Sequence, residues 1–72
     1  MPYQIIATKR EWVNDIEQYT TKIEIYVKSK KMKDKIKQVF EERGYEVSSK
    51  FVNKLPDNTM KFSEYILVKK NE

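Results

Sequence analysis

The chain has 72 residues, which is enough for one domain spanning residues 1–72 and excludes an architecture of two halves. Val, Ile, Leu and Phe make up 18 of the 72 residues. This apolar fraction predicts a folded chain rather than a disordered one. The net charge is a modest +4, and a domain this small has a limited core, so self-association or a partner is a reasonable expectation.

The residue types that are missing exclude most kinds of active site. The chain has no His, no Cys and a single glycine, Gly44. Catalytic triads need an imidazole or an equivalent base, zinc sites need His or Cys, and phosphate-binding loops need several glycines. No two of the 11 carboxylates form a recognisable acidic motif. The sequence therefore predicts a protein that is not an enzyme and has no cofactor and no metal site.

The N-terminal residues do not resemble a targeting segment. Ile5, Ile6 and Ala7 are followed, after Thr8, by the charged residues Lys9, Arg10 and Glu11, and no apolar run is long enough to cross a membrane. These features predict a cytoplasmic protein with no membrane contact. The abundance of Lys, Asn and Ile is typical of AT-rich coding sequences and favours a low-GC bacterium, its phages or its plasmids as the source.

Residues 3–7 form a weak strand candidate, and two readings compete for the segment that follows. Thr8 and Glu11 have the spacing of a capping box, and a short helix over residues 9–19 is favoured by the apolar spacing of Trp12, Val13, Ile16 and Tyr19. Alternatively, the Asn14-Asp15 pair turns a hairpin that joins residues 3–13 to 16–28. In both readings the alternation of Ile23, Ile25 and Val27 with polar residues predicts a half-buried strand.

A helix over residues 30–43 is the clearest element. One apolar stripe is formed by Met32, Ile36, Val39 and Phe40. Ser29 is positioned as the N-cap. Gly44 is positioned as a left-handed residue after the helix, which would bring Phe40 and Tyr45 into the contact of a Schellman motif.

The C-terminal third reads as a hairpin of two strands joined at Pro56 to Thr59. Pairing Leu55 with Met60 would place the apolar residues of both strands on one face. The fold class is thus α+β: a single small domain with a mostly antiparallel sheet and one long, and with the first reading one short, helix packed on one face. The element order is β-α-β-α-β-β, or alternatively β-β-α-β-β. The first order resembles that of small basic nucleic-acid-binding domains such as Alba and the C-terminal domain of translation initiation factor three, in element order alone.

Positive charge is concentrated before and along the central helix. The segment of residues 28–37 carries a net charge of +5, with Asp34 as its one acid. The first turn of the helix is basic and its last turn is acidic, the reverse of what the helix dipole favours. This pattern suggests a site for the phosphate backbone of a nucleic acid, and its alternative is a solvated lysine face. The lysines assigned to the site are Lys28, Lys30, Lys31, Lys33 and Lys37.

The C-terminal hairpin supplies a second group of candidates. Its predicted register sets Lys54 opposite Lys61 and Lys50 opposite Tyr65, so that a lysine ribbon could follow a phosphate backbone while the tyrosine ring stacks on a base. The alternative is that these lysines protect a strand edge from pairing. With only two arginines in the chain, any nucleic-acid binding should tolerate most sequences.

Three large rings suggest a competing function. Trp12, Tyr19 and Tyr26 either pack in the core or form an exposed anchor for a protein partner. The sequence thus favours an accessory protein that binds DNA or RNA backbone with little specificity. The alternative is a protein–protein interaction module, such as a phage-encoded inhibitor of a host enzyme. A homodimer with edge-paired sheets is compatible with either function.

Overall fold

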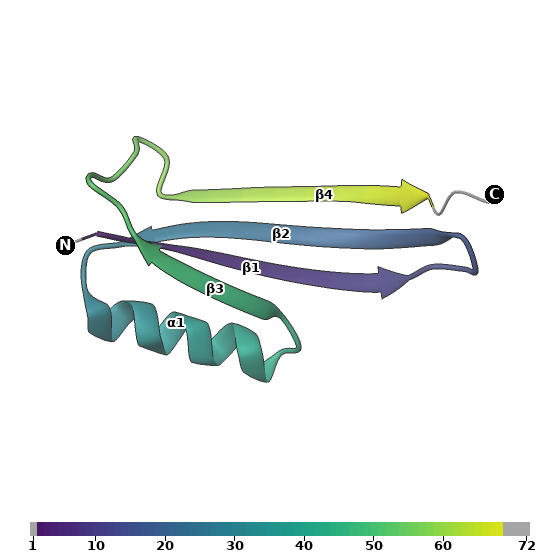
Figure 1. Cartoon of the computed structure of the whole chain (residues 1–72), viewed down its shortest axis with the longest axis horizontal. Helices are drawn as coiled ribbons and strands as arrows, with labels where there is room; N and C mark the ends of the chain where they lie inside the picture. The colour runs from purple at the N-terminus through teal and green to yellow at the C-terminus, as the bar shows by residue number, and fades with distance from the viewer. Residues whose placement is uncertain (1, 69–72) are drawn as a thin grey trace.

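The structure, a computed structural model, describes residues 2–68 and consists of one sheet with one helix on it (Figure 1). In chain order the elements are β1 (Tyr3–Trp12), β2 (Glu17–Val27), α1 (Lys30–Glu42), β3 (Glu46–Phe51) and β4 (Met60–Val68). The sheet has the strand order β3-β1-β2-β4, and every neighbouring pair is antiparallel. The predicted α+β class with a single small antiparallel sheet is confirmed, in the order β-β-α-β-β.

The short helix favoured for residues 9–19 is wrong, and the hairpin reading is correct. β1 and β2 pair without interruption from Tyr3 opposite Val27 to Trp12 opposite Gln18. The turn between them is built by Asn14, whose side-chain Oδ1 accepts hydrogen bonds from the backbone amides of Ile16 and Glu17, both at 2.9 Å. Because an asparagine side chain can satisfy turn amides in this way, no Gly or Pro is needed. The likeness of element order to Alba-type domains depended on the absent helix and is lost with it.

α1 has the ends that the sequence predicts. The side chain of Ser29 accepts a hydrogen bond from the backbone amide of Met32 at 3.1 Å. At the other end Gly44 has a φ of +88°, and the amide of Tyr45 donates to the carbonyl of Phe40 at 3.0 Å. The rings of Phe40 and Tyr45 meet edge to face with 5.1 Å between centroids. The Schellman motif and its apolar contact are both present.

The predicted hairpin of residues 45–55 and 60–68 is wrong, because its two strands lie at opposite edges of the sheet. β3 pairs with β1, and β4 pairs with β2, so the β1–β2 hairpin lies between β3 and β4. The loop between β3 and β4 crosses the end of that hairpin (Figure 1) and is anchored at both sides. Val52 donates a backbone hydrogen bond to Pro2 at 3.1 Å, and Tyr26 donates one to Thr59 at 2.9 Å.

The helix covers one face of the sheet only in part. α1 packs against β3, β1 and the near side of β2, and within residues 2–68 it makes no contact with β4. The tip of the β1–β2 hairpin and the second half of β4 project beyond α1 and β3 (Figure 1). Among the described residues only Ile5, Ala7 and Thr20 are fully buried. The core is therefore confined to the covered end of the sheet, and much of β2 and β4 has no layer above it.

Candidate nucleic-acid interface

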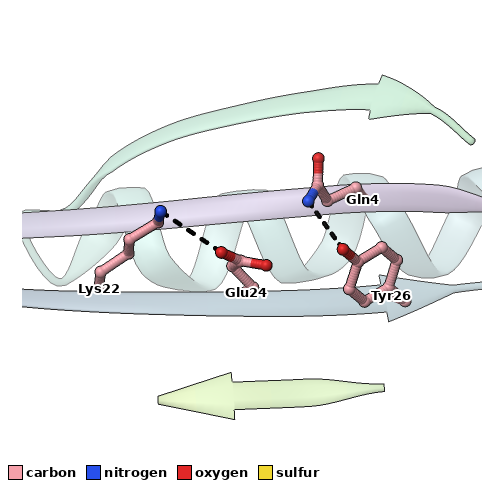
Figure 2. A network of polar contacts seen from close by, with 4 residues as sticks. All are labelled: Gln4, Lys22, Glu24 and Tyr26. Carbon is pink, nitrogen blue, oxygen red and sulfur yellow. Dashed lines mark hydrogen bonds and ion pairs between the residues drawn. The ribbon is translucent and has the colours of Figure 1, made fainter. Parts of the chain in front are cut away.

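The two faces of the sheet are distinguished by the residues that meet the helix. The ammonium group of Lys33 in α1 lies 5.2 Å from the ring centroid of Tyr3, and Lys9 lies beside Gly44 and over the ring of Tyr45. Odd-numbered residues of β1 therefore face α1, and because directly paired residues share a face, the register assigns the other strands. The opposite side, which we call the open face, is turned away from α1, which lies behind the sheet in Figure 2.

The open face carries aromatic and basic side chains from all four strands. Its three large rings are Trp12, Tyr26 and Tyr65. Its basic residues are Arg10, Lys22, Lys50 and Lys61. Trp12, Lys50, Lys61 and Tyr65 are exposed, with Trp12 at 60% of its maximal area. Among residues 2–68, Lys50 and Lys61 form no ion pair, whereas Arg10 and Lys22 are each paired with a glutamate, Glu46 at 3.5 Å and Glu24 at 3.4 Å.

Polar contacts lie on this face near the end of the sheet where β1 begins and β2 ends (Figure 2). The amide nitrogen of Gln4 donates a hydrogen bond of 2.8 Å to the hydroxyl of Tyr26, which fixes that ring across the β1–β2 pair. The other amide atom, Gln4 Oε1, and the hydroxyl of Thr20 are buried with no partner among the described protein groups. Because both atoms are enclosed by neighbouring groups, a ligand lying on the open face would not reach them.

Beside this network the surface has only shallow relief. One open hollow of about 280 Å³ is lined by Gln4, Ile6, Ser48, Ser49 and Lys50. A second hollow of about 270 Å³ lies further along β1 and β3. Both fall below the range of about 300–1,000 Å³ that is typical of pockets for small ligands. The geometry suits an extended ligand lying across the strands better than a compact one.

The lysines of the central segment lie on the other side of the molecule. Lys28, Lys30 and Lys31 are exposed around the first turn of α1. Lys33 is different: its side chain is 15% exposed and pairs with Asp34 at 2.9 Å, besides lying over the ring of Tyr3. Lys37 is half-buried. The lysines predicted as a site are thus divided between the helix and the open face, with the sheet between them.

Asp34 partly compensates the charge at the start of α1. A hydrogen bond from Lys33 and the positive charges of Lys33, Lys30 and Lys37 lower the pKa of Asp34 below its ordinary value. One carboxylate therefore lies among three ammonium groups. Within residues 2–68 Asp34 forms an ion pair with Lys33 alone, and the net charge of +5 already includes this carboxylate.

The remaining candidates are dispersed by the fold. Lys54 lies in the loop after β3, and its predicted pairing with Lys61 is wrong, as is that of Lys50 with Tyr65, because β3 and β4 are not neighbours. Tyr19 lies on the helix side of β2 and Tyr26 on the open face, so the three rings do not form one cluster. The exposure of Trp12 excludes the interpretation that it packs against the helix.

Sequence reasoning missed the contributions of β1 and β2 to the open face. Arg10, Lys22 and Gln4 are not among the residues assigned to a binding site from the sequence, although a signal was present. Residues 3–12 and 17–27 form two paired strands, and successive residues of a strand point to opposite faces of the sheet. Assigning this hairpin from the sequence would have placed Arg10, Lys22 and Gln4 on the same face as Tyr26.

Other kinds of site were also sought. Within residues 2–68 no group of three or more acidic residues is placed to hold a metal ion. No helix in that part of the chain has both the length and the apolar character needed to span a membrane. Comparison with models of protein families, with curated proteins and with solved structures gave no match, so the geometry alone supports the functional assignment that follows.

Proposed function

We propose that this protein is a small non-enzymatic accessory protein that binds single-stranded DNA or RNA across the open face of its sheet, with little sequence specificity. The observation that carries the proposal is the presence of Trp12, Tyr26 and Tyr65 on one uncovered sheet face together with Lys50 and Lys61. Aromatic rings on a sheet stack on unpaired bases, and lysines attract the phosphate backbone.

The charge distribution supports contact with backbone rather than base-specific recognition. Lys50 and Lys61 belong to the two edge strands, so they flank the polar network of Gln4 and Tyr26 on either side. An ammonium group is a point charge without the planar fork that reads a base edge. Arg10, which has that fork, is paired with Glu46. Binding should therefore depend strongly on salt and weakly on sequence.

The experiment compares two charge reversals of equal size on opposite sides of the sheet. Binding of a labelled single-stranded oligonucleotide is followed by fluorescence anisotropy at two salt concentrations for the wild type, Lys50→Glu/Lys61→Glu and Lys30→Glu/Lys31→Glu. All four lysines are exposed, but Lys61→Glu sets a carboxylate opposite Glu24, so a circular dichroism spectrum of each variant must first show that it is folded. We expect wild-type affinity to fall steeply with salt and the open-face variant to lose at least tenfold in affinity, while the helix variant loses less.

Three results would contradict the proposal. One is no binding to DNA or RNA, the second is binding that is independent of salt, and the third is a larger loss in the helix variant than in the open-face variant. The third result would indicate that the lysines at the start of α1 form the binding site. A duplex of the same sequence serves as a further comparison. Its paired bases cannot stack on the rings, so the duplex should bind more weakly than the single strand.

A protein–protein interaction module is the second candidate, and the exposure of Trp12 and its neighbours favours it. Val13 and Ile16 are also exposed at the tip of the β1–β2 hairpin. Exposed aromatic residues are common anchors at protein interfaces. In that case Trp12→Ala should abolish a stoichiometric complex with a host protein, whereas the open-face charge reversal should leave that complex intact.

A further inference from the structure

β4 is an edge strand with few of the features that normally keep such an edge from pairing. It runs for nine residues, contains no proline, and has only Lys61 and Glu64 as charged residues. All nine residues are exposed. A long, flat and apolar edge presents a row of unpaired backbone groups to any strand that can align with it. The other edge, β3, is only six residues long and is partly covered by α1.

The side chains of β4 are apolar on both faces of the sheet. Met60, Phe62, Ile66 and Val68 lie on the helix side, where α1 does not reach them, and Leu67 joins Tyr65 on the open face. Phe62 is 60% exposed, Ile66 53% and Val68 63%. Scattered apolar residues at a surface are normal, but a contiguous exposed strip of this kind marks an interaction site.

The area of the whole molecule leads to the same conclusion. The chain exposes 5742 Å², whereas a compact monomer of 8.7 kDa would expose about 4,700 Å². The excess of roughly 1,000 Å² is comparable with the ~800 Å² that each partner buries in a standard protein interface. With three fully buried residues in the described part of the chain, the molecule has apolar surface to spare for an interface with a second copy.

We infer that β4 pairs with β4 of a second copy, antiparallel and about a two-fold axis, to form a homodimer with one continuous eight-stranded sheet. The axis must be perpendicular to the sheet, because only that operation makes two copies of one strand antiparallel neighbours. Both helices then lie on the same side. The two open faces also join, with Tyr65 and Lys61 of each copy near the centre. The inference does not depend on the proposed function.

Symmetry restricts the register to a few possibilities. Each allowed two-fold axis passes next to one residue of β4. That residue then lies directly opposite the same residue of the second copy. An axis at the middle residue, Glu64, gives the longest pairing but sets two carboxylates directly opposite each other, which is unfavourable. An axis at Tyr65 or Ser63 avoids this repulsion, but it shortens the paired part of each strand by two residues. With the axis at Tyr65, Phe62 lies opposite Val68 of the second copy, an apolar pair.

The absence of cysteine makes a crosslinking experiment decisive. In single variants Ser63→Cys, Glu64→Cys and Tyr65→Cys, a disulfide forms only between two copies. Directly opposite residues have Cα atoms ~4.5–5.5 Å apart, within the range that a disulfide spans. We expect crosslinking at position 63 or 65, and also at 64 because Glu64→Cys removes the repulsion between the two carboxylates, whereas the crosslinked fraction should be several-fold lower for the control Ser48→Cys, an exposed position on the other edge strand.

Mass in solution tests the dimer without any crosslink. Light scattering should give the wild type twice the 8.7 kDa of one chain. Ile66→Glu, which with the axis at Tyr65 sets a second carboxylate opposite Glu64 of the other copy, should give a monomer with an unchanged circular dichroism spectrum, and Val13→Glu, a control at a comparably exposed apolar residue outside β4, should remain a dimer. A monomeric wild type, or crosslinking at Ser48 as strong as in β4, would overturn the inference. Failure of oligonucleotide binding would leave it standing.

Discussion

Gly44 has a backbone conformation that side chains rarely tolerate, and the end of α1 depends on it. Its φ of +88° lets the amides of Gly44 and Tyr45 reach the carbonyls of Glu41 and Phe40. A Cβ at this position would meet no close atom, since the nearest is Lys9 Cε at 3.9 Å. The effect of a substitution is therefore conformational rather than steric crowding.

Gly44→Ala should accordingly lower the free energy of unfolding by about 1 kcal/mol. The measurement is chemical denaturation followed by circular dichroism. Lys35→Ala, at an exposed position of the same helix, is the control and should change stability by less than about 0.5 kcal/mol. An unchanged midpoint for Gly44→Ala would mean that the chain can end the helix in another way.

At the residue scale much could be predicted, because caps are local. Ser29, Gly44 and the Phe40–Tyr45 contact follow from spacing within a few residues, and all are present. Lys50, Lys61, Tyr65, Tyr26 and Trp12 were also recognised individually as candidates. Their common location could not be predicted, since it depends on which strands become neighbours, and that is decided by residues far apart in the chain.

At the element scale the β1–β2 hairpin is the central unit, and its turn can be tested. Asn14 accepts hydrogen bonds from two backbone amides and also donates one from its amide nitrogen to the carboxylate of Glu17 at 2.8 Å. Asn14→Ala removes all three hydrogen bonds. It should lower the free energy of unfolding by about 1–2 kcal/mol, because hydrogen bonds of this kind usually stabilise a fold by about that amount in total.

Denaturation curves for Asn14→Ala and for Asp15→Ala, its exposed neighbour in the same turn, provide the comparison. Asp15→Ala should have little effect. Equal losses in the two variants would show that the turn does not depend on the asparagine side chain.

The two element predictions that failed have different causes. Over residues 9–19 the apolar residues fit a helical period, but Trp12 and Tyr19 belong to opposite faces of a sheet, and the alternation on either side of Asn14 was the stronger signal. The C-terminal hairpin failed because an apolar strand does not specify its neighbour. β3 and β4 have compatible patterns, yet each pairs with a strand of the first hairpin instead.

At the scale of the whole molecule, the sheet separates two chemically different surfaces. α1 and its lysines occupy one side, with Asp34 among them. The open face occupies the other, with its rings and with Lys50 and Lys61, which form no ion pair within residues 2–68. On the helix side the cover is incomplete, which leaves β4 for a second copy. In the proposed dimer both open faces point the same way, so one strand of nucleic acid could cross from one copy to the other.

The most direct test of which side binds uses Trp12, the only tryptophan of the chain and a residue of the open face. Its emission is recorded while a single-stranded oligonucleotide is added, in parallel with the anisotropy of the labelled oligonucleotide. If bases stack on the open face, tryptophan emission should be quenched and should saturate at the same concentration as the anisotropy. Binding that raises the anisotropy while leaving Trp12 emission unchanged would contradict the account and point to α1.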